Sequence, residues 1–139
     1  APSRIVLSGP CEHSAFLAAY NEVDVALQTF PYCGGVTLLE GLWMGVPGIA
    51  MNGETFAARH GVSHLSNLGL AQFVAQSERD YVQRAVRTAH DWDLLSSLRS
   101  QLRDRMRNSP LCNRALFGRN LGIGLRRAWA AWCDRAGAP

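Results

Sequence analysis

The 139-residue sequence contains no lysine, and all fourteen of its basic side chains are arginines. It has no apolar run of the roughly 18 residues that a membrane-spanning helix needs, and no basic stripe with interleaved aromatic residues of the kind that binds nucleic acid. The cysteines Cys11, Cys33, Cys112 and Cys133 form no C-x-x-C pair, so neither a zinc knuckle nor a redox motif is expected. We therefore expect binding neither to membranes nor to nucleic acid, and scattered cysteines fit a reducing, cytoplasmic setting.

Hydrophobic residues make up 47% of the chain and charged residues 18%, which is typical of a soluble globular protein. We expect one domain over residues 1–139, cut from a longer chain, since the sequence lacks an initiator Met and enters an apolar run at once. Short apolar runs predict strands, and between them apolar residues at helical spacing predict helices. The predicted strands cover 5–8, 23–27, 48–51 and 71–75, and the predicted helices cover 12–21, 37–44, 54–68, a segment capped by Ser77, 93–106 and 116–132.

Strands that alternate with helices favour an α/β fold with a Rossmann-like parallel sheet and flanking helices. The chain ends in two helices with no strand between them, a helical carboxy-terminal extension over about residues 93–135. We expect these helices to pack back across the sheet or onto another domain. Trp129 and Trp132 lie three residues apart on one predicted helical face, so they are expected to anchor that packing.

The segment from Thr29 to Glu40 follows one predicted strand and opens the next predicted helix. In open α/β sheets, ligands bind outside the carboxyl ends of the strands. Gly34 and Gly35 allow the backbone to approach a ligand, and the free N–H groups of the first helical turn can hold a phosphate. Thr37 adds a hydroxyl group, and the carboxylate one turn further on can accept hydrogen bonds from the hydroxyls of a ribose. A Gly-Gly pair before a helix is also common without any ligand, and this one is neither a P-loop nor a G-x-G-x-x-G motif.

A longer pattern favours a binding site: G-G-x-T-x-x-E-x-L-x-x-G-x-P runs from Gly34 to Pro47. With the later blocks GETFAAR (53–59), SNLGL (66–70), DY (80–81) and RNSPLC (107–112), it resembles the carboxy-terminal catalytic part of the family 41 glycosyltransferases. These are the O-GlcNAc transferase and SPINDLY-like proteins, which are often fused to tetratricopeptide repeats. The resemblance covers nearly the whole chain.

The resemblance implies a GT-B enzyme built from two Rossmann-like halves with the donor between them. This chain would be the carboxy-terminal half, incomplete, and would bind the UDP of UDP-GlcNAc while N-acetylglucosamine passes to Ser or Thr hydroxyls of an acceptor protein. No metal cofactor is implied, and no catalytic residue lies in this part. The implied nucleotide-sugar site has three parts: Gly34, Gly35, Val36 and Thr37 at the diphosphate, Glu40 at the ribose, and His13 beside the uracil.

Several features depart from the family pattern. Val36 stands where Thr is usual, so diphosphate binding would depend on backbone N–H groups and Thr37, and Gln28 stands where Asp is usual. The amino-terminal catalytic half is absent, as are the first strands of this half, with the lysine that meets the donor phosphates in the family. We expect the fragment to be inactive alone. The strand predicted at 5–8 would pair differently, or the fragment would self-associate through an exposed sheet edge.

Other functions stay open at this point. The chain could be a non-enzymatic module that binds nucleotide or a protein partner, or part of a SPINDLY-like transferase that uses GDP-fucose. His60 and His64 have the spacing of metal ligands on a helix, but they lack the H-E-x-x-H pattern. Packing or capping is therefore the favoured interpretation, with substrate contact as an alternative.

Overall fold

The structure, a computed structural model, describes residues 2–137. Its sheet has three short parallel strands in the order β1-β2-β3. These are β1 (Ala26–Leu27), β2 (Gly48–Met51) and β3 (Val74–Ala75). The described α-helices are α1 (His13–Ala19), α2 (Val36–Trp43), α3 (His60–Asn67), α4 (Glu78–Ala89), α5 (Trp92–Arg107) and α6 (Arg114–Ala136). The predicted α/β class with a parallel sheet and flanking helices is confirmed.

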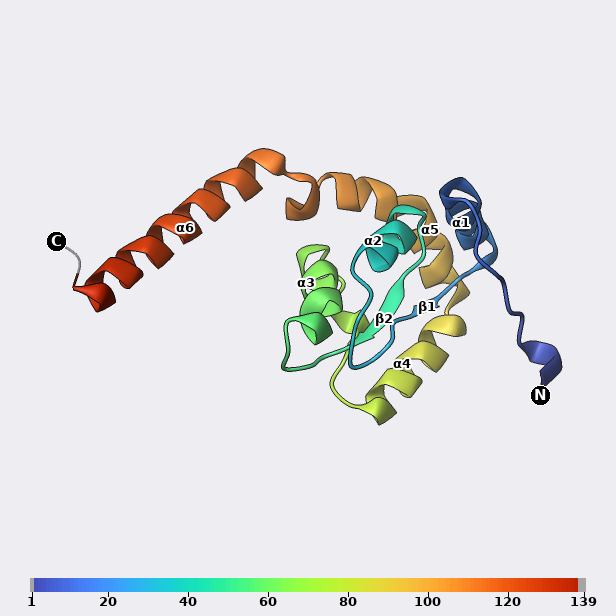
Figure 1. The fold of residues 1–139 in the computed structure, drawn as a ribbon. Coiled ribbons are helices and arrows are strands. Elements are labelled where there is room, and N and C mark those ends of the chain that lie inside the picture. Colours follow the sequence, from blue (N-terminus) through green and yellow to red (C-terminus); the bar gives the residue numbers. More distant parts are fainter. Residues whose placement is uncertain (1, 138–139) are drawn as a thin grey trace.

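The central strand, β2, is the middle of the hydrophobic core. Ile49 and Ala50 are fully buried, and helices α2, α3 and α4 all contact this strand (Figure 1). Gly61 of α3 lies so close to the sheet that a Cβ atom there would come within 2.5 Å of the Cβ atom of Ala50. A small residue at this position therefore lets α3 approach the sheet closely.

Helix α2 ends where the sequence pattern predicts, at the Gly-Val-Pro segment. Gly45 has a φ of +86°, and a Cβ atom there would lie 2.7 Å from the carbonyl oxygen of Arg99. Only glycine meets both conditions without strain. The guanidinium group of Arg99 in turn donates hydrogen bonds to the carbonyl oxygens of Tyr20 and Met44, at 3.0 and 3.1 Å. Helix α5 is thereby tied to the ends of α1 and α2.

The capping residue predicted for the fourth helix, α4, is confirmed, because the Oγ atom of Ser77 accepts a hydrogen bond from the backbone N–H of Asp80 at 3.2 Å.

The next helix, α5, is part of the core rather than of an extension. It buries four apolar side chains at helical spacing against the rest of the fold: Leu95, Leu98, Leu102 and Met106.

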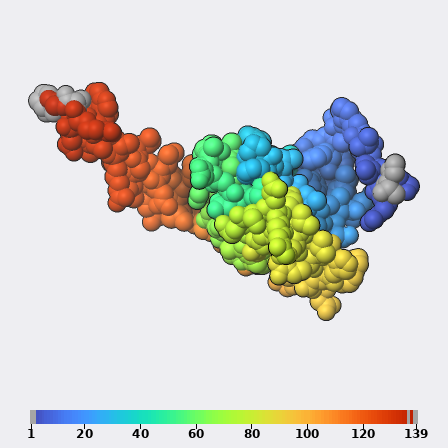
Figure 2. Space-filling view, turned by 90° about the horizontal axis from the view of Figure 1, so that it is seen from below, coloured from blue at the N-terminus to red at the C-terminus, as the bar shows by residue number. Residues whose placement is uncertain are grey.

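Helix α6 projects away from the rest of the molecule (Figures 1 and 2). The rings of Trp129 and Trp132 stack on each other at a centroid distance of 5.1 Å, yet these side chains are 65% and 53% exposed. Packing of α6 back across the sheet is therefore excluded by the structure, and the tryptophans are not part of the core of this chain. The alternative, that α6 packs onto another domain through these tryptophans, stays a prediction. The single domain over residues 1–139 stays a prediction, since the chain ends lie outside the described residues.

The strand predicted at residues 5–8 is also wrong. This segment forms no strand, and Ile5, Val6 and Leu7 are 68%, 88% and 92% exposed. A β-strand needs a neighbour to satisfy its backbone hydrogen-bonding groups, and none of the three described strands lies beside this segment. Self-association through this part of the chain stays a prediction.

Candidate functional site

The glycine pair lies in the loop that leaves the carboxyl end of β1 and enters α2 (Figure 1). Gly35 is the N-cap residue of α2, and no side chain caps this helix end. The N–H groups in the first turn of a helix have no partner within the helix. Since Gly34 and Gly35 are only half-buried and Val36 is 68% exposed, these groups are within reach of a ligand.

Two polar side chains converge on Gly34. A Cβ atom at this position would lie 2.5 Å from the Oγ1 atom of Thr37 and 2.7 Å from the Oε1 atom of Gln28. Helix α4 also contacts the start of this loop, because the hydroxyl group of Tyr81 donates a 2.9 Å hydrogen bond to the carbonyl oxygen of Gln28. The start of the loop that leads to the cradle of residues 34–37 is thus tied to α4, a contact that the sequence did not predict.

Glu40 meets His13 at the other end of the candidate site. Their Oε1 and Nε2 atoms lie 2.7 Å apart, between α2 and the first turn of α1. A second contact joins the same helices, since the hydroxyl group of Tyr20 donates to the carbonyl oxygen of Thr37 at 3.0 Å. Burial, and secondarily the charge of Glu40, raises the pKa of Tyr20, so this phenol stays a neutral donor. Of the six residues that the sequence singled out, five therefore lie on α2 or directly before it, and His13 lies against it.

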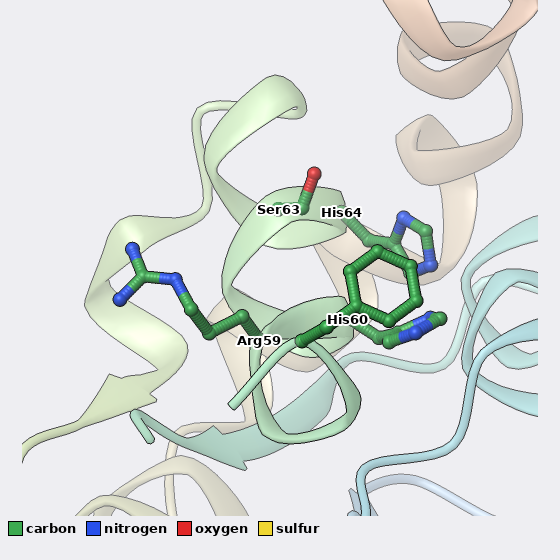
Figure 3. A pocket seen from close by; sticks show the side chains of 5 residues that line it. Arg59, His60, Ser63 and His64 are labelled. Carbon is green, nitrogen blue, oxygen red and sulfur yellow. The ribbon is translucent and has the colours of Figure 1, made fainter. Parts of the chain in front are cut away.

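A pocket of about 390 Å³ opens beside this cradle, at the start of α3. Figure 3 shows four of its side chains, Arg59, His60, Ser63 and His64, and Phe56 completes the lining. The segment that carries them follows the carboxyl end of β2, one strand away from the glycine loop. The helix predicted over 54–68 begins here as a single 3-10 turn (Ala57–Arg59) before α3.

His64 carries a buried polar atom without a partner in this pocket. Its Nδ1 atom is buried and has no hydrogen-bond partner. Burial, and to a lesser extent the charge of His60, lowers the pKa of His64, so its ring is neutral around neutral pH. The two rings lie 6.1 Å apart in an edge-to-face arrangement. Within residues 2–137 there is no cluster of three or more His, Cys, Asp or Glu side chains that could hold a metal ion.

No helix in the described part of the chain is both long and apolar enough to cross a membrane.

The model of the family "Glycosyl transferase family 41" matches residues 1–121. Among curated proteins, the chain is 44% identical over 118 residues to a probable UDP-N-acetylglucosamine–peptide N-acetylglucosaminyltransferase SPINDLY of Solanum lycopersicum. It is 36% identical over 102 residues to a UDP-N-acetylglucosamine–peptide N-acetylglucosaminyltransferase of Caenorhabditis elegans. These matches cover 85% and 73% of this chain but only 13% and 9% of the two relatives, so the chain spans a small part of their length.

A solved structure of a mutant Thermobaculum terrenum O-GlcNAc transferase superposes with a TM-score of 0.87 at 36% sequence identity. The superposition covers 98% of this chain and 26% of the other. The family model, the curated relatives and the superposed structure agree, and the chain belongs to glycosyl transferase family 41.

Proposed function

We propose that this chain is the nucleotide-sugar-binding part of a protein O-GlcNAc transferase, which transfers N-acetylglucosamine from UDP-GlcNAc to Ser or Thr hydroxyls of an acceptor protein. The observation that carries the proposal is the cradle of residues 34–37 at the carboxyl end of β1, with the carboxylate of Glu40 one helical turn along. Other parts of a longer protein would supply the amino-terminal catalytic half, the acceptor site and tetratricopeptide repeats.

The cradle suits the leaving group of a glycosyl transfer. Negative charge builds on the diphosphate as the bond to the sugar breaks, and N–H groups fixed beforehand stabilise that charge without rearranging. The uncapped N-terminus of α2 supplies such groups together with the favourable end of the helix dipole. Thr37 adds a hydroxyl donor at the same end. The chemistry asks for no metal ion at this position.

Glu40 is placed to bind the ribose. Its Oε1 atom already meets His13, which leaves the second carboxylate oxygen to accept hydrogen bonds from ribose hydroxyls. His13 is exposed on α1, so its ring can lie against the base that the ribose carries. In this arrangement His13 both orients the carboxylate and borders the uracil.

Isothermal titration calorimetry with UDP, GDP and uridine tests the proposal on the 139-residue chain. We expect UDP to bind more tightly than GDP or uridine. Glu40→Ala should weaken UDP binding by about tenfold or more, the effect of losing hydrogen bonds to a charged group. The matched control is Glu22→Ala, which removes an exposed carboxylate from the turn after α1.

Each other outcome identifies a different function. Tighter binding of GDP than of UDP would replace the donor with a GDP-sugar, as in a GDP-fucose-using SPINDLY-like transferase. No nucleotide binding by the wild-type chain would contradict the proposal and leave a module that binds a protein partner.

A further inference from the structure

His60 lies directly against the phosphate cradle. A Cβ atom on Gly35 would be 3.3 Å from the Nδ1 atom of His60 and 3.8 Å from its Cε1 atom. Gly35 is the N-cap of α2, so the imidazole ring stands beside the helix end whose N–H groups lack partners. The two residues come from different strand–helix connections, which meet because β1 and β2 are parallel neighbours.

The polar atoms of His60 are available to a ligand. Neither ring nitrogen has a hydrogen-bond partner among the described residues, and the ring is held by aromatic contacts alone. Phe56 packs edge-to-face at a centroid distance of 4.7 Å, and Tyr32 lies at 6.4 Å. The ring is therefore positioned, but its hydrogen-bonding capacity is unused.

Arg59 is the alternative cation in this pocket, and its geometry is unsuitable. Figure 3 shows the guanidinium group pointing away from the side on which the rings of His60 and His64 lie. Its Nη1 atom donates to the carbonyl oxygen of Gly53 at 3.4 Å. The chain has no lysine at all, so His60 is the basic side chain of this pocket that faces the cradle.

His64 packs edge-to-face against His60 at a centroid distance of 6.1 Å. Its Nδ1 atom is buried without a partner in the same pocket, and its lowered pKa keeps the ring neutral. A neutral neighbour does not compete with an anion for His60, as a carboxylate would. The charged and titratable groups around His60 are His64 and Arg59 on its own segment, and Tyr32 and the buried thiol Cys33 on the glycine loop.

We propose that His60 is a donor-binding residue whose imidazole N–H donates a hydrogen bond to a phosphate oxygen of the nucleotide sugar. This inference rests on the proposed function, because it places the diphosphate at the N-terminus of α2. His60 then completes the cradle from the side of α3, where the backbone N–H groups of residues 34–37 do not reach.

Calorimetric titration of the 139-residue chain with UDP, inorganic pyrophosphate and uridine tests this role. His60→Phe keeps an aromatic ring against Gly35 and Phe56 but removes the hydrogen-bond donor. It should weaken the binding of UDP and pyrophosphate by about tenfold, which corresponds to one hydrogen bond to a charged group, and leave uridine binding unchanged. His60→Gln retains an N–H donor and should restore part of the affinity. The control is His90→Phe, the same change at the exposed end of α4.

The outcomes separate this inference from the proposed function. If His60→Phe binds UDP and pyrophosphate like the wild type while Glu40→Ala still weakens UDP, His60 is not a phosphate ligand and the donor site stands. Equal losses for uridine and pyrophosphate would show a general disturbance of the site and would also overturn the assignment. If the wild-type chain binds neither UDP nor pyrophosphate, the donor site itself is wrong.

Discussion

The replacement Gly34→Ala tests the geometry of the cradle most directly. The added Cβ atom would lie 2.5 Å from the Oγ1 atom of Thr37 and 2.7 Å from the Oε1 atom of Gln28, well inside the roughly 3.5 Å of a favourable contact. Gly34 has no positive φ, so alanine fits the backbone and the conflict is confined to these two side chains. Both must turn away, and the hydroxyl group of Thr37 leaves the helix end.

The expected effects follow from these contacts. Losing one hydrogen bond to a charged phosphate costs about 1.5–3 kcal/mol, so the Kd for UDP should rise by roughly tenfold to a hundredfold. The free energy of unfolding should fall by only about 1 kcal/mol, the low end for overpacking, because half-exposed side chains can move. Calorimetry and urea denaturation measure the two effects separately. Wild-type affinity in Gly34→Ala would refute the role of the Thr37 hydroxyl group in the cradle.

Three further predictions concern stability, each measured by urea denaturation. Gly118→Ala should raise the free energy of unfolding by about 0.5–1 kcal/mol, since the site is open helix with nothing within 4 Å; a loss would show that α6 is not helical there. His64→Leu should raise it by about 1 kcal/mol by removing the orphan Nδ1 atom. The folded-state pKa of His64 lies below its ordinary 6.5, so the fold favours the neutral ring. The free energy of unfolding of the wild type should therefore fall as the pH drops below 6.5, and the leucine variant should lose this pH dependence. Arg99→Lys should cost about 1–2 kcal/mol, because one ammonium group cannot reproduce a fork whose Nη1 atom reaches Tyr20 and Met44 while its Nη2 atom reaches Val23; an unchanged midpoint would contradict this.

Features fixed by neighbouring residues could be predicted from the sequence. Ser77 stands three residues before Asp80, and the cap forms as predicted. The buried strand over 48–51 coincides with β2, because a short apolar run between a Gly-Val-Pro stop and an Asn-Gly turn leaves few alternatives. The glycine pair likewise lies at the start of α2. Each of these signals is complete within a few residues of chain.

Features that depend on a distant partner could not be predicted. The apolar run at Ile5–Leu7 has the composition of a strand, but a strand also needs a neighbour, and the structure leaves these side chains exposed. The spacing of Trp129 and Trp132 correctly indicates one apolar helical face, yet nothing in the spacing says what covers it. In both cases hydrophobicity predicts that a surface is suited to burial, and only the tertiary arrangement decides whether it is buried.

The position of His60 shows how the same limit affects the candidate site. In the sequence, Gly35 and His60 are separated by a helix and a strand. The spacing of His60 and His64 favoured packing or capping, with substrate contact as an alternative, and nothing in it connected His60 to the glycine loop. The parallel register that pairs Ala26 with Gly48 brings the carboxyl ends of β1 and β2 to one edge. Each strand then delivers its following loop to the same place: the first supplies backbone N–H groups, and the second an imidazole. A parallel sheet thus brings together the two loops of the proposed phosphate site, of which only the glycine-rich one carries a local signal in its sequence.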